Sequence, residues 1–129
     1  MISRFHLTIP ANTSKENPKT LDIELPVGVI HKIDIVFPPG CCGLAGVAIF
    51  HGLHQVWPSY SDSWFSTDGE TISFEEFYEV KPGFTTFTLK GYNEDDTYQH
   101  TIIFRFGVLK RSEIQGIWLP WSEEVGIEE

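Results

Sequence analysis

The chain has 129 residues, of which 14% are aromatic, and a formal net charge of −9. That length is sufficient for one domain with its own hydrophobic core. The acidic charge disfavours a nucleic-acid partner, and no apolar run approaches the roughly 18 residues of a membrane span. The first ten residues contain no apolar signal-peptide segment, so we expect a protein that is made and kept in a cytoplasm.

Alternation of apolar and polar residues, typical of strands with one buried face, starts close to the N-terminus. It predicts strands from Arg4 to Ile9 and from Thr20 to Leu25, the latter with Leu21, Ile23 and Leu25 pointing inward. The next alternating segment runs from residue 29 to residue 37. Its strict two-residue period assigns one face to Val29, His31, Ile33, Ile35 and Phe37. Pro38, Pro39 and Gly40 end this strand.

The segment after these prolines predicts a buried strand and a hairpin. Val47 to His51 is almost continuously apolar, and a second short strand runs from His54 to Trp57. The pair Gly52-Leu53 between them favours a type II′ turn, because glycine adopts positive φ at its first central position. Cys41 and Cys42 are adjacent. A disulfide between neighbours would be strained, so we expect two small buried thiols.

Three further strands follow a long loop. Residues 58–70 are irregular, and Trp64 and Phe65 could pack that loop against the body. A strand from Thr71 to Val80 has an expected irregularity at Glu75-Glu76. Phe84 to Tyr92 and His100 to Leu109 complete the set, separated by the acidic turn from Asn93 to Asp96.

These segments predict an all-β, single-domain β-sandwich of the jelly-roll kind, with about eight strands, in residues 1–111. No amphipathic pattern of helical period exceeds about two turns, so we expect almost no helix. We expect the centre of the core to contain residues from several strands: Ile33, Ile35, Val47, Ile49, Phe87, Ile102 and Phe104.

Residues 112–129 have a different composition and predict an irregular C-terminal arm. They contain five acidic and no basic side chains, together with seven large apolar ones: Ile114, Ile117, Trp118, Leu119, Trp121, Val125 and Ile127. A disordered tail is usually poor in such residues. We therefore expect the arm to bind a neighbouring subunit through Ile117, Trp118, Leu119 and Trp121. The alternative is an extra strand on its own domain.

Few residue patterns indicate chemistry. His51, His54 and His100 could hold a metal in a cupin-like enzyme, although the spacing of the cupin metal motif is missing. Asn93 to Asp96 could bind calcium, but a turn in which Asn93 or Asp95 accepts backbone N–H groups is the simpler interpretation. No motif of a hydrolase, a phosphate-binding loop or a zinc protease is present. We therefore predict no catalytic site, no metal and no cofactor.

Three aromatic residues within eight positions, Trp57, Tyr60 and Trp64, form a candidate recognition surface. Exposed aromatic rings on β-sandwiches can stack on sugar rings, which favours a carbohydrate- or receptor-binding module as an alternative function. Packing of these rings within the loop or the core is the competing interpretation.

Two longer stretches resemble a known family. Residues 37–59 read FPPGCCGLAGVAIFHGLHQVWPS, and residues 91–104 read GYNEDDTYQHTIIF. Together with Ile9-Pro10-Ala11-Asn12-Thr13, this pattern resembles small all-β proteins encoded by tailed bacteriophages and related prophages. The resemblance covers residues 4–109 and implies a virion structural protein, of the head-decoration or another capsid-associated type.

The sequence therefore favours a non-enzymatic, capsid-associated protein of the virion that acts through subunit contacts. Its expected partners are further copies of itself, in a homo-oligomer such as a trimer, and other virion proteins. The carbohydrate- or receptor-binding module of a fibre or adhesin is the alternative.

Overall fold

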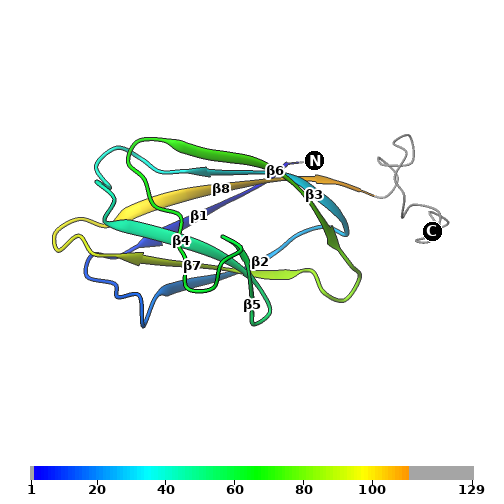
Figure 1. Cartoon of the computed structure of the whole chain (residues 1–129), viewed down its shortest axis with the longest axis horizontal. Helices are drawn as coiled ribbons and strands as arrows, with labels where there is room; N and C mark the ends of the chain where they lie inside the picture. Colours follow the sequence, from blue (N-terminus) through cyan, green and yellow to red (C-terminus); the bar gives the residue numbers. More distant parts are fainter. Residues whose placement is uncertain (1, 111–129) are drawn as a thin grey trace.

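The computed structural model describes residues 2–110, which form two four-stranded antiparallel sheets packed face to face (Figure 1). Sheet A has the strand order β1-β8-β3-β6, and sheet B has the order β2-β7-β4-β5. The strands are β1 (Ile2–Ile9), β2 (Lys19–Glu24), β3 (Gly28–Val36), β4 (Ala45–His51), β5 (His54–Trp57), β6 (Thr71–Val80), β7 (Thr86–Asn93) and β8 (His100–Leu109). The described residues contain no helix, and hence none that could cross a membrane.

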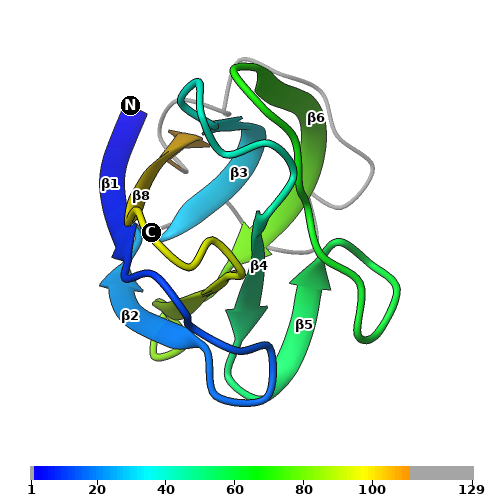
Figure 2. The same cartoon turned by 90° about the vertical axis from the view of Figure 1, so that its left-hand side faces the viewer.

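The strand pairing is that of one long hairpin rolled up on itself. Pairs β1–β8 and β3–β6 lie in sheet A, whereas β2–β7 and β4–β5 lie in sheet B. Additional pairing of β3 with β8, and of β4 with β7, completes each sheet. This arrangement is the eight-stranded jelly roll, so the predicted all-β sandwich is confirmed. In Figure 2, β1 lies next to β2 on one side of the molecule.

The core between the sheets contains the residues that the alternation predicted. Ile33, Ile35, Val47, Ile49, Phe87, Ile102 and Phe104 are all 0% exposed. On β8, the residues from His100 to Val108 alternate as expected, with Phe104 and Phe106 inside and Arg105 outside. Partly buried aromatic side chains, among them Phe65 and Phe74, extend this core at its β5–β6 side.

The face assigned to the beginning of β3 was wrong. Ile30 is fully buried, whereas His31 is half-buried and lies over Gly107 of β8. The reason is a bulge: Ile30 pairs with Val108 and Lys32 pairs with Gly107, so His31 is an extra residue relative to β8. On β6, the register shifts between Glu75 and Tyr78, which confirms the predicted irregularity there.

Leu21 lies on the inner face as predicted, because it pairs directly with the fully buried Leu89, but it is 36% exposed because β2 is an edge strand. The burial predicted for both cysteines was wrong for one of them. Cys42 is exposed and has a φ of 52°, while Cys41 is buried as predicted. The tight turn from Gly40 to Gly43 directs the two side chains differently, so adjacency in sequence did not give equal burial.

The predicted hairpin is confirmed. His51 and His54 are directly paired, and of the two turn residues only Gly52, with a φ of 67°, adopts positive φ. This pattern fits a type II′ turn, since a type I′ turn needs positive φ at both positions. Leu53 is fully exposed at its tip.

Candidate functional site

The outer face of sheet A carries basic side chains on three adjacent strands. Arg4 on β1 is the direct cross-strand neighbour of Arg105 on β8, which in turn is paired with Asp34 on β3. All three side chains point away from the core, since their neighbours Phe5, Phe104 and Ile33 point into it. Lys32 and His31 lie one row further along β3.

Arg105 is incompletely satisfied by the residues around it. Its Nε lies 3.6 Å from Oδ2 of Asp34, which allows ionic attraction but is beyond hydrogen-bonding distance. The other carboxylate oxygen of Asp34 accepts a hydrogen bond of 2.5 Å from the Ser73 hydroxyl. Among the described side chains, Arg105 Nε is a buried nitrogen that has no hydrogen-bond partner.

A hollow of about 340 Å³ lies beside this row, lined by Ile2, His31, Lys32, Asp34, Arg105 and Gly107. Gly107 forms part of its floor, because a Cβ there would come within 2.8 Å of His31 Nε2. Ile2 is 74% exposed at the edge. The hollow therefore has mainly apolar surface, with the cationic groups of Lys32 and Arg105 and the carboxylate of Asp34 beside it. Such a site suits an acidic side chain that is carried on a partly apolar peptide.

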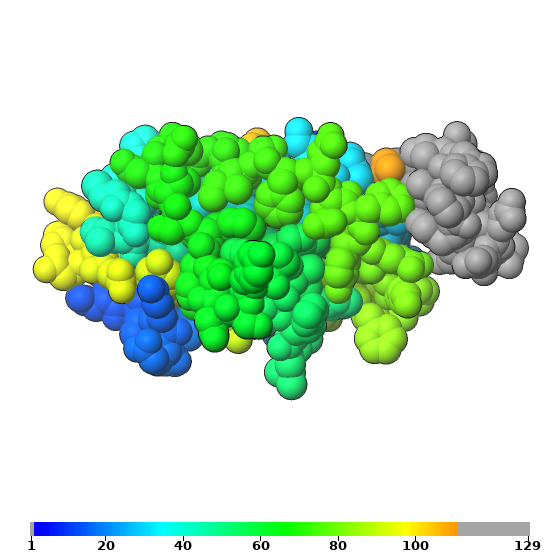
Figure 3. All heavy atoms as spheres, in the orientation of Figure 1, coloured from blue at the N-terminus to red at the C-terminus, as the bar shows by residue number. Residues whose placement is uncertain are grey.

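A second depression lies where β5 faces β6, on the side of the molecule seen in Figure 3. It has a volume of about 290 Å³ and is lined mainly by aromatic residues and one acid: Trp57, Pro58, Ser59, Tyr60, Phe65, Phe74 and Glu76. The Trp57 indole N–H donates a 2.9 Å hydrogen bond to Glu76 Oε2 and so connects the two sheets.

The loop above this depression is held by Gln55 on β5. Its side-chain nitrogen lies 2.9, 3.1 and 2.9 Å from the carbonyl oxygens of Pro58, Tyr60 and Ser63. Further along, Phe65 exchanges backbone hydrogen bonds with Val47 of β4. The Phe65 ring packs against the core and Phe74, and the Trp64 ring packs on Tyr92, so the predicted role of both residues in packing this loop is confirmed.

The three aromatic residues predicted as a recognition surface do not form one platform. Trp57 is only 4% exposed and belongs to the core, while Trp64 packs edge-to-face on Tyr92 with ring centroids 5.0 Å apart. Tyr60 is 79% exposed. The depression is lined instead by Phe65 and Phe74 together with Trp57 and Tyr60. This arrangement could not be predicted from the local sequence, because β5 and β6 belong to different sheets and meet only in the folded protein.

The three histidines considered for a metal site do not converge. His51 Nδ1 lies 2.7 Å from the Tyr78 hydroxyl, its Nε2 lies 2.8 Å from the Phe84 carbonyl oxygen, and its ring stacks on Phe87. His100 contacts Asp95 in the turn between β7 and β8 instead. Burial raises the pKa of Tyr78, the partner of His51 Nδ1, so this hydroxyl stays protonated at neutral pH. Within residues 2–110, no group of three potential metal ligands is found.

The acidic turn is fixed by its own hydrogen bonds, as predicted. Asn93 is 0% exposed, and its side-chain nitrogen donates to the carbonyls of Ile9 and Tyr98 while its oxygen accepts from the backbone N–H of Asp95. Asp95 accepts the N–H groups of Thr97 and Tyr98 and lies 3.0 Å from His100 Nε2. These hydrogen bonds, first that from Thr97, lower the pKa of Asp95.

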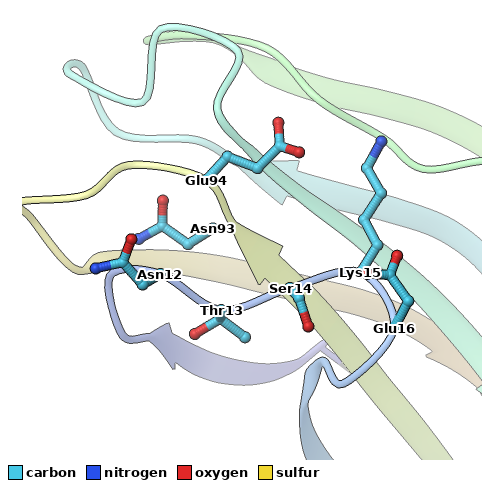
Figure 4. Close-up of a pocket in the computed structure, with 7 residues that line it drawn as sticks. All are labelled: Asn12, Thr13, Ser14, Lys15, Glu16, Asn93 and Glu94. Carbon is cyan, nitrogen blue, oxygen red and sulfur yellow. The ribbon is translucent and has the colours of Figure 1, made fainter.

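A polar depression of about 260 Å³ adjoins this turn (Figure 4). It is lined by Asn12, Thr13, Ser14, Lys15, Glu16, Asn93 and Glu94. Thr13 and Asn93 join its two walls by reciprocal backbone hydrogen bonds of 2.9 Å. Lys15 Nζ lies 4.8 Å from the centre of the Tyr92 ring, a cation–π contact. Its polar groups thus mainly fasten the β1–β2 loop to the end of β7.

The cysteine turn has a structural organisation as well. Asp68 Oδ1 accepts the backbone N–H groups of Gly40 and Cys42 at 2.9 and 3.0 Å, and these bonds, first that from Cys42, lower the pKa of Asp68. Burial, followed by the charge of Asp68, raises the pKa of Cys41 to about 11. The Cys41 thiol is therefore protonated at neutral pH and is a poor nucleophile.

The predicted partner-binding residues, Ile117, Trp118, Leu119 and Trp121, lie outside the described residues, as does the division of the chain at residue 112. The basic face of sheet A was missed by the sequence reasoning. Arg4, Lys32 and Arg105 are far apart in sequence, and they come together only through the β1–β8 and β3–β8 registers.

Comparison with known proteins gives little further information. No family model matches the sequence, and no curated protein matches it. Among solved structures, the chain is similar to a family two carbohydrate esterase from Cellvibrio japonicus, with 10% sequence identity and a TM-score of 0.34. That match covers 84% of this chain but only 35% of the esterase chain.

Proposed function

We propose that this protein is a non-enzymatic structural component of a virion, a capsid-associated protein of the decoration type that acts through contacts between subunits. In this proposal it is made in the host cytoplasm and functions in the assembled particle. Its partners are further copies of itself and other virion proteins.

The observation that carries the proposal is the complete jelly roll in residues 2–109. Both sheets have their four strands, and the core side chains of β8 are already fully buried. The apolar residues from Ile114 to Ile127 come after this closed body in the sequence. Burying one large apolar side chain contributes roughly 1.5–3 kcal/mol. A contact with a neighbouring subunit would use that energy for assembly.

The fold and the resemblance also favour this function. The double-sheet jelly roll is found in viral capsid domains, in lectins and in cupins, so the fold alone leaves several functions open. The resemblance of residues 4–109 to small proteins of tailed phages supports the first of these. The closely tied loops, such as that around Gln55, give a body that can dock without rearranging.

Imaging of particles from the host that carries this sequence tests the proposal. We expect symmetry-related copies of the jelly roll on the capsid surface. Deleting residues 112–129 should leave the melting temperature of the body nearly unchanged and remove the protein from the particles. Abundant protein in the lysate with none in purified particles would contradict the proposal, and a truncated protein that unfolds would place the arm in the domain's own core.

The aromatic depression favours a second candidate, a carbohydrate- or receptor-binding module. Tyr60 and Phe74 offer ring surface, and Glu76 offers an acceptor for hydroxyl groups. Binding on a glycan array that is lost in Tyr60→Ala and retained in Tyr98→Ala, another exposed tyrosine, would support this function. Equal binding by both variants would exclude the depression as the glycan-binding site.

A further inference from the structure

We infer that the outer face of sheet A is the docking site for the acidic C-terminal segment, residues 112–129, of a second copy of this chain. The inference rests on the proposed function, since it names the surface through which copies would associate. It concerns Arg4, Lys32 and Arg105, together with the hollow lined by His31 and Gly107.

Two arginines lie opposite each other on this face of sheet A. Arg4 and Arg105 are direct cross-strand neighbours on one face, so their Cβ atoms are separated by about 4.5–5.5 Å. Like charges in this position destabilise a sheet. Asp34 offsets part of that repulsion, yet its contact with Arg105 is 3.6 Å long and one of its oxygens is engaged by Ser73. An additional anion would relieve the remaining repulsion.

Arg105 also has binding capacity that its neighbours do not use. No described residue accepts a hydrogen bond from its buried Nε, while its side chain as a whole is 42% exposed, so the guanidinium group can be reached from outside the sheet. A guanidinium group binds a carboxylate through two parallel hydrogen bonds. The adjoining hollow of about 340 Å³ provides space for an incoming glutamate side chain, and the exposed Ile2 provides a small apolar contact beside it.

The C-terminal segment has the charge that fits this face. Residues 112–129 carry five glutamates and no basic residue. The same segment has the apolar residues needed for contact area. If the segment of one copy binds the face of the next, the contact is head-to-tail, and repetition of such a contact closes a ring when the rotation allows. A ring is compatible with an oligomer on a symmetric capsid.

A charge-swap experiment on the full chain tests the inference. The face variant is Arg4→Glu, and the segment variant is Glu123→Lys with Glu124→Lys. The control is Lys19→Glu, which makes the same charge change on an exposed residue of β2 in sheet B. Molar mass is measured by sedimentation velocity in low and high salt, after circular dichroism has verified that each variant is folded.

We expect the wild type and Lys19→Glu to associate, with weaker association in high salt. Each of the other two variants alone should associate on the order of tenfold more weakly, as expected when one favourable charge pair becomes repulsive. An equimolar mixture of these two variants should recover association, because a lysine-bearing segment then meets a glutamate-bearing face, and the wild-type pairing recurs at the other contact.

Three outcomes would overturn the inference. The first is a wild type that is monomeric under all conditions, and the second is a mixture that associates no better than its components. The third is Arg4→Glu behaving like Lys19→Glu. None of these removes the virion proposal, which is decided by the presence of the protein on particles. Conversely, recovery in the mixture would establish the docking surface even if particles lacked the protein.

Discussion

The outer faces of the two sheets satisfy their charged groups in different ways. On sheet B, acids and hydroxyl donors are direct cross-strand neighbours: Thr88 donates a 2.7 Å hydrogen bond to Asp22, and Thr86 donates to Glu24. On sheet A, Arg4 stands opposite Arg105, whose buried Nε has no hydrogen-bond partner among the described residues. Sheet A has a similar contact, since Ser73 donates to its direct neighbour Asp34, but it also places two like charges opposite each other.

Lysines lie on both outer faces. Lys90 Nζ lies 4.2 Å from the centre of the half-buried Phe50 ring on the outer face of sheet B, a cation–π contact. On sheet A, Lys32 lines the hollow beside Arg105 and is the direct cross-strand neighbour of Glu75. The two faces therefore differ most clearly at the Arg4–Arg105 pair, on which the proposed docking surface depends. Four substitutions, in order of decreasing effect, test this comparison.

The largest effect should come from the core that both faces share. Phe104→Ala removes a fully buried ring between the sheets and should lower the free energy of unfolding by about 3–5 kcal/mol in urea denaturation. Arg105→Gln, one residue further along β8 and on the outer side, is the control and should have a far smaller effect. A loss below about 1 kcal/mol for Phe104→Ala would mean that the inner face of β8 is wrongly assigned.

The second effect concerns the turn that joins sheet B to sheet A. Asn93→Ala removes an amide that bonds Ile9, Tyr98 and Asp95, and should cost about 1–3 kcal/mol with or without calcium. Asn17→Ala, which alters an exposed amide in the loop between β1 and β2, should cost much less. Loss of wild-type stability on adding a chelator would indicate instead that the turn binds a metal.

The third substitution should stabilise the protein. Arg4→Thr removes the like-charged neighbour of Arg105, so in dilute, low-salt solution we expect a gain of roughly 0.2–1 kcal/mol in the free energy of unfolding. The same change should weaken self-association. Thermal denaturation at several salt concentrations measures the effect, which should shrink as salt screens the repulsion. A loss of stability would show that Arg4 is already satisfied within its own chain.

The smallest effect is expected on sheet B. Hydrogen bonds from Thr86, and then from Thr85, lower the pKa of Glu24 below its ordinary value of 4.5. A lowered pKa in the folded state means that the ionised form stabilises the fold above pH 4.5, and that this contribution is lost as the pH falls through the lower value. Glu24→Gln should therefore reduce stability slightly at pH 7 and flatten its acid dependence. An unchanged acid profile would argue against these hydrogen bonds in solution.

The strands, the Gly52 turn and the hydrogen-bonded turn at Asn93 could all be predicted from the sequence. Each of these depends on residues close together in the chain: alternation is a local property, glycine alone adopts positive φ without cost, and Asn and Asp bond to backbone two residues away. The inward residues of β8, such as Phe104 and Phe106, could be assigned for the same reason.

Contacts between residues that are far apart in the chain could not be predicted in this way. The strict period failed at His31, because a bulge relative to β8 can be seen only when both strands are aligned. The sequence left open whether Trp57 is exposed or buried, since its burial depends on Glu76 and Phe74 of the other sheet. The pairing of Arg4 with Arg105 joins residues about a hundred positions apart, and strand register, which is set by the whole core, brings them together.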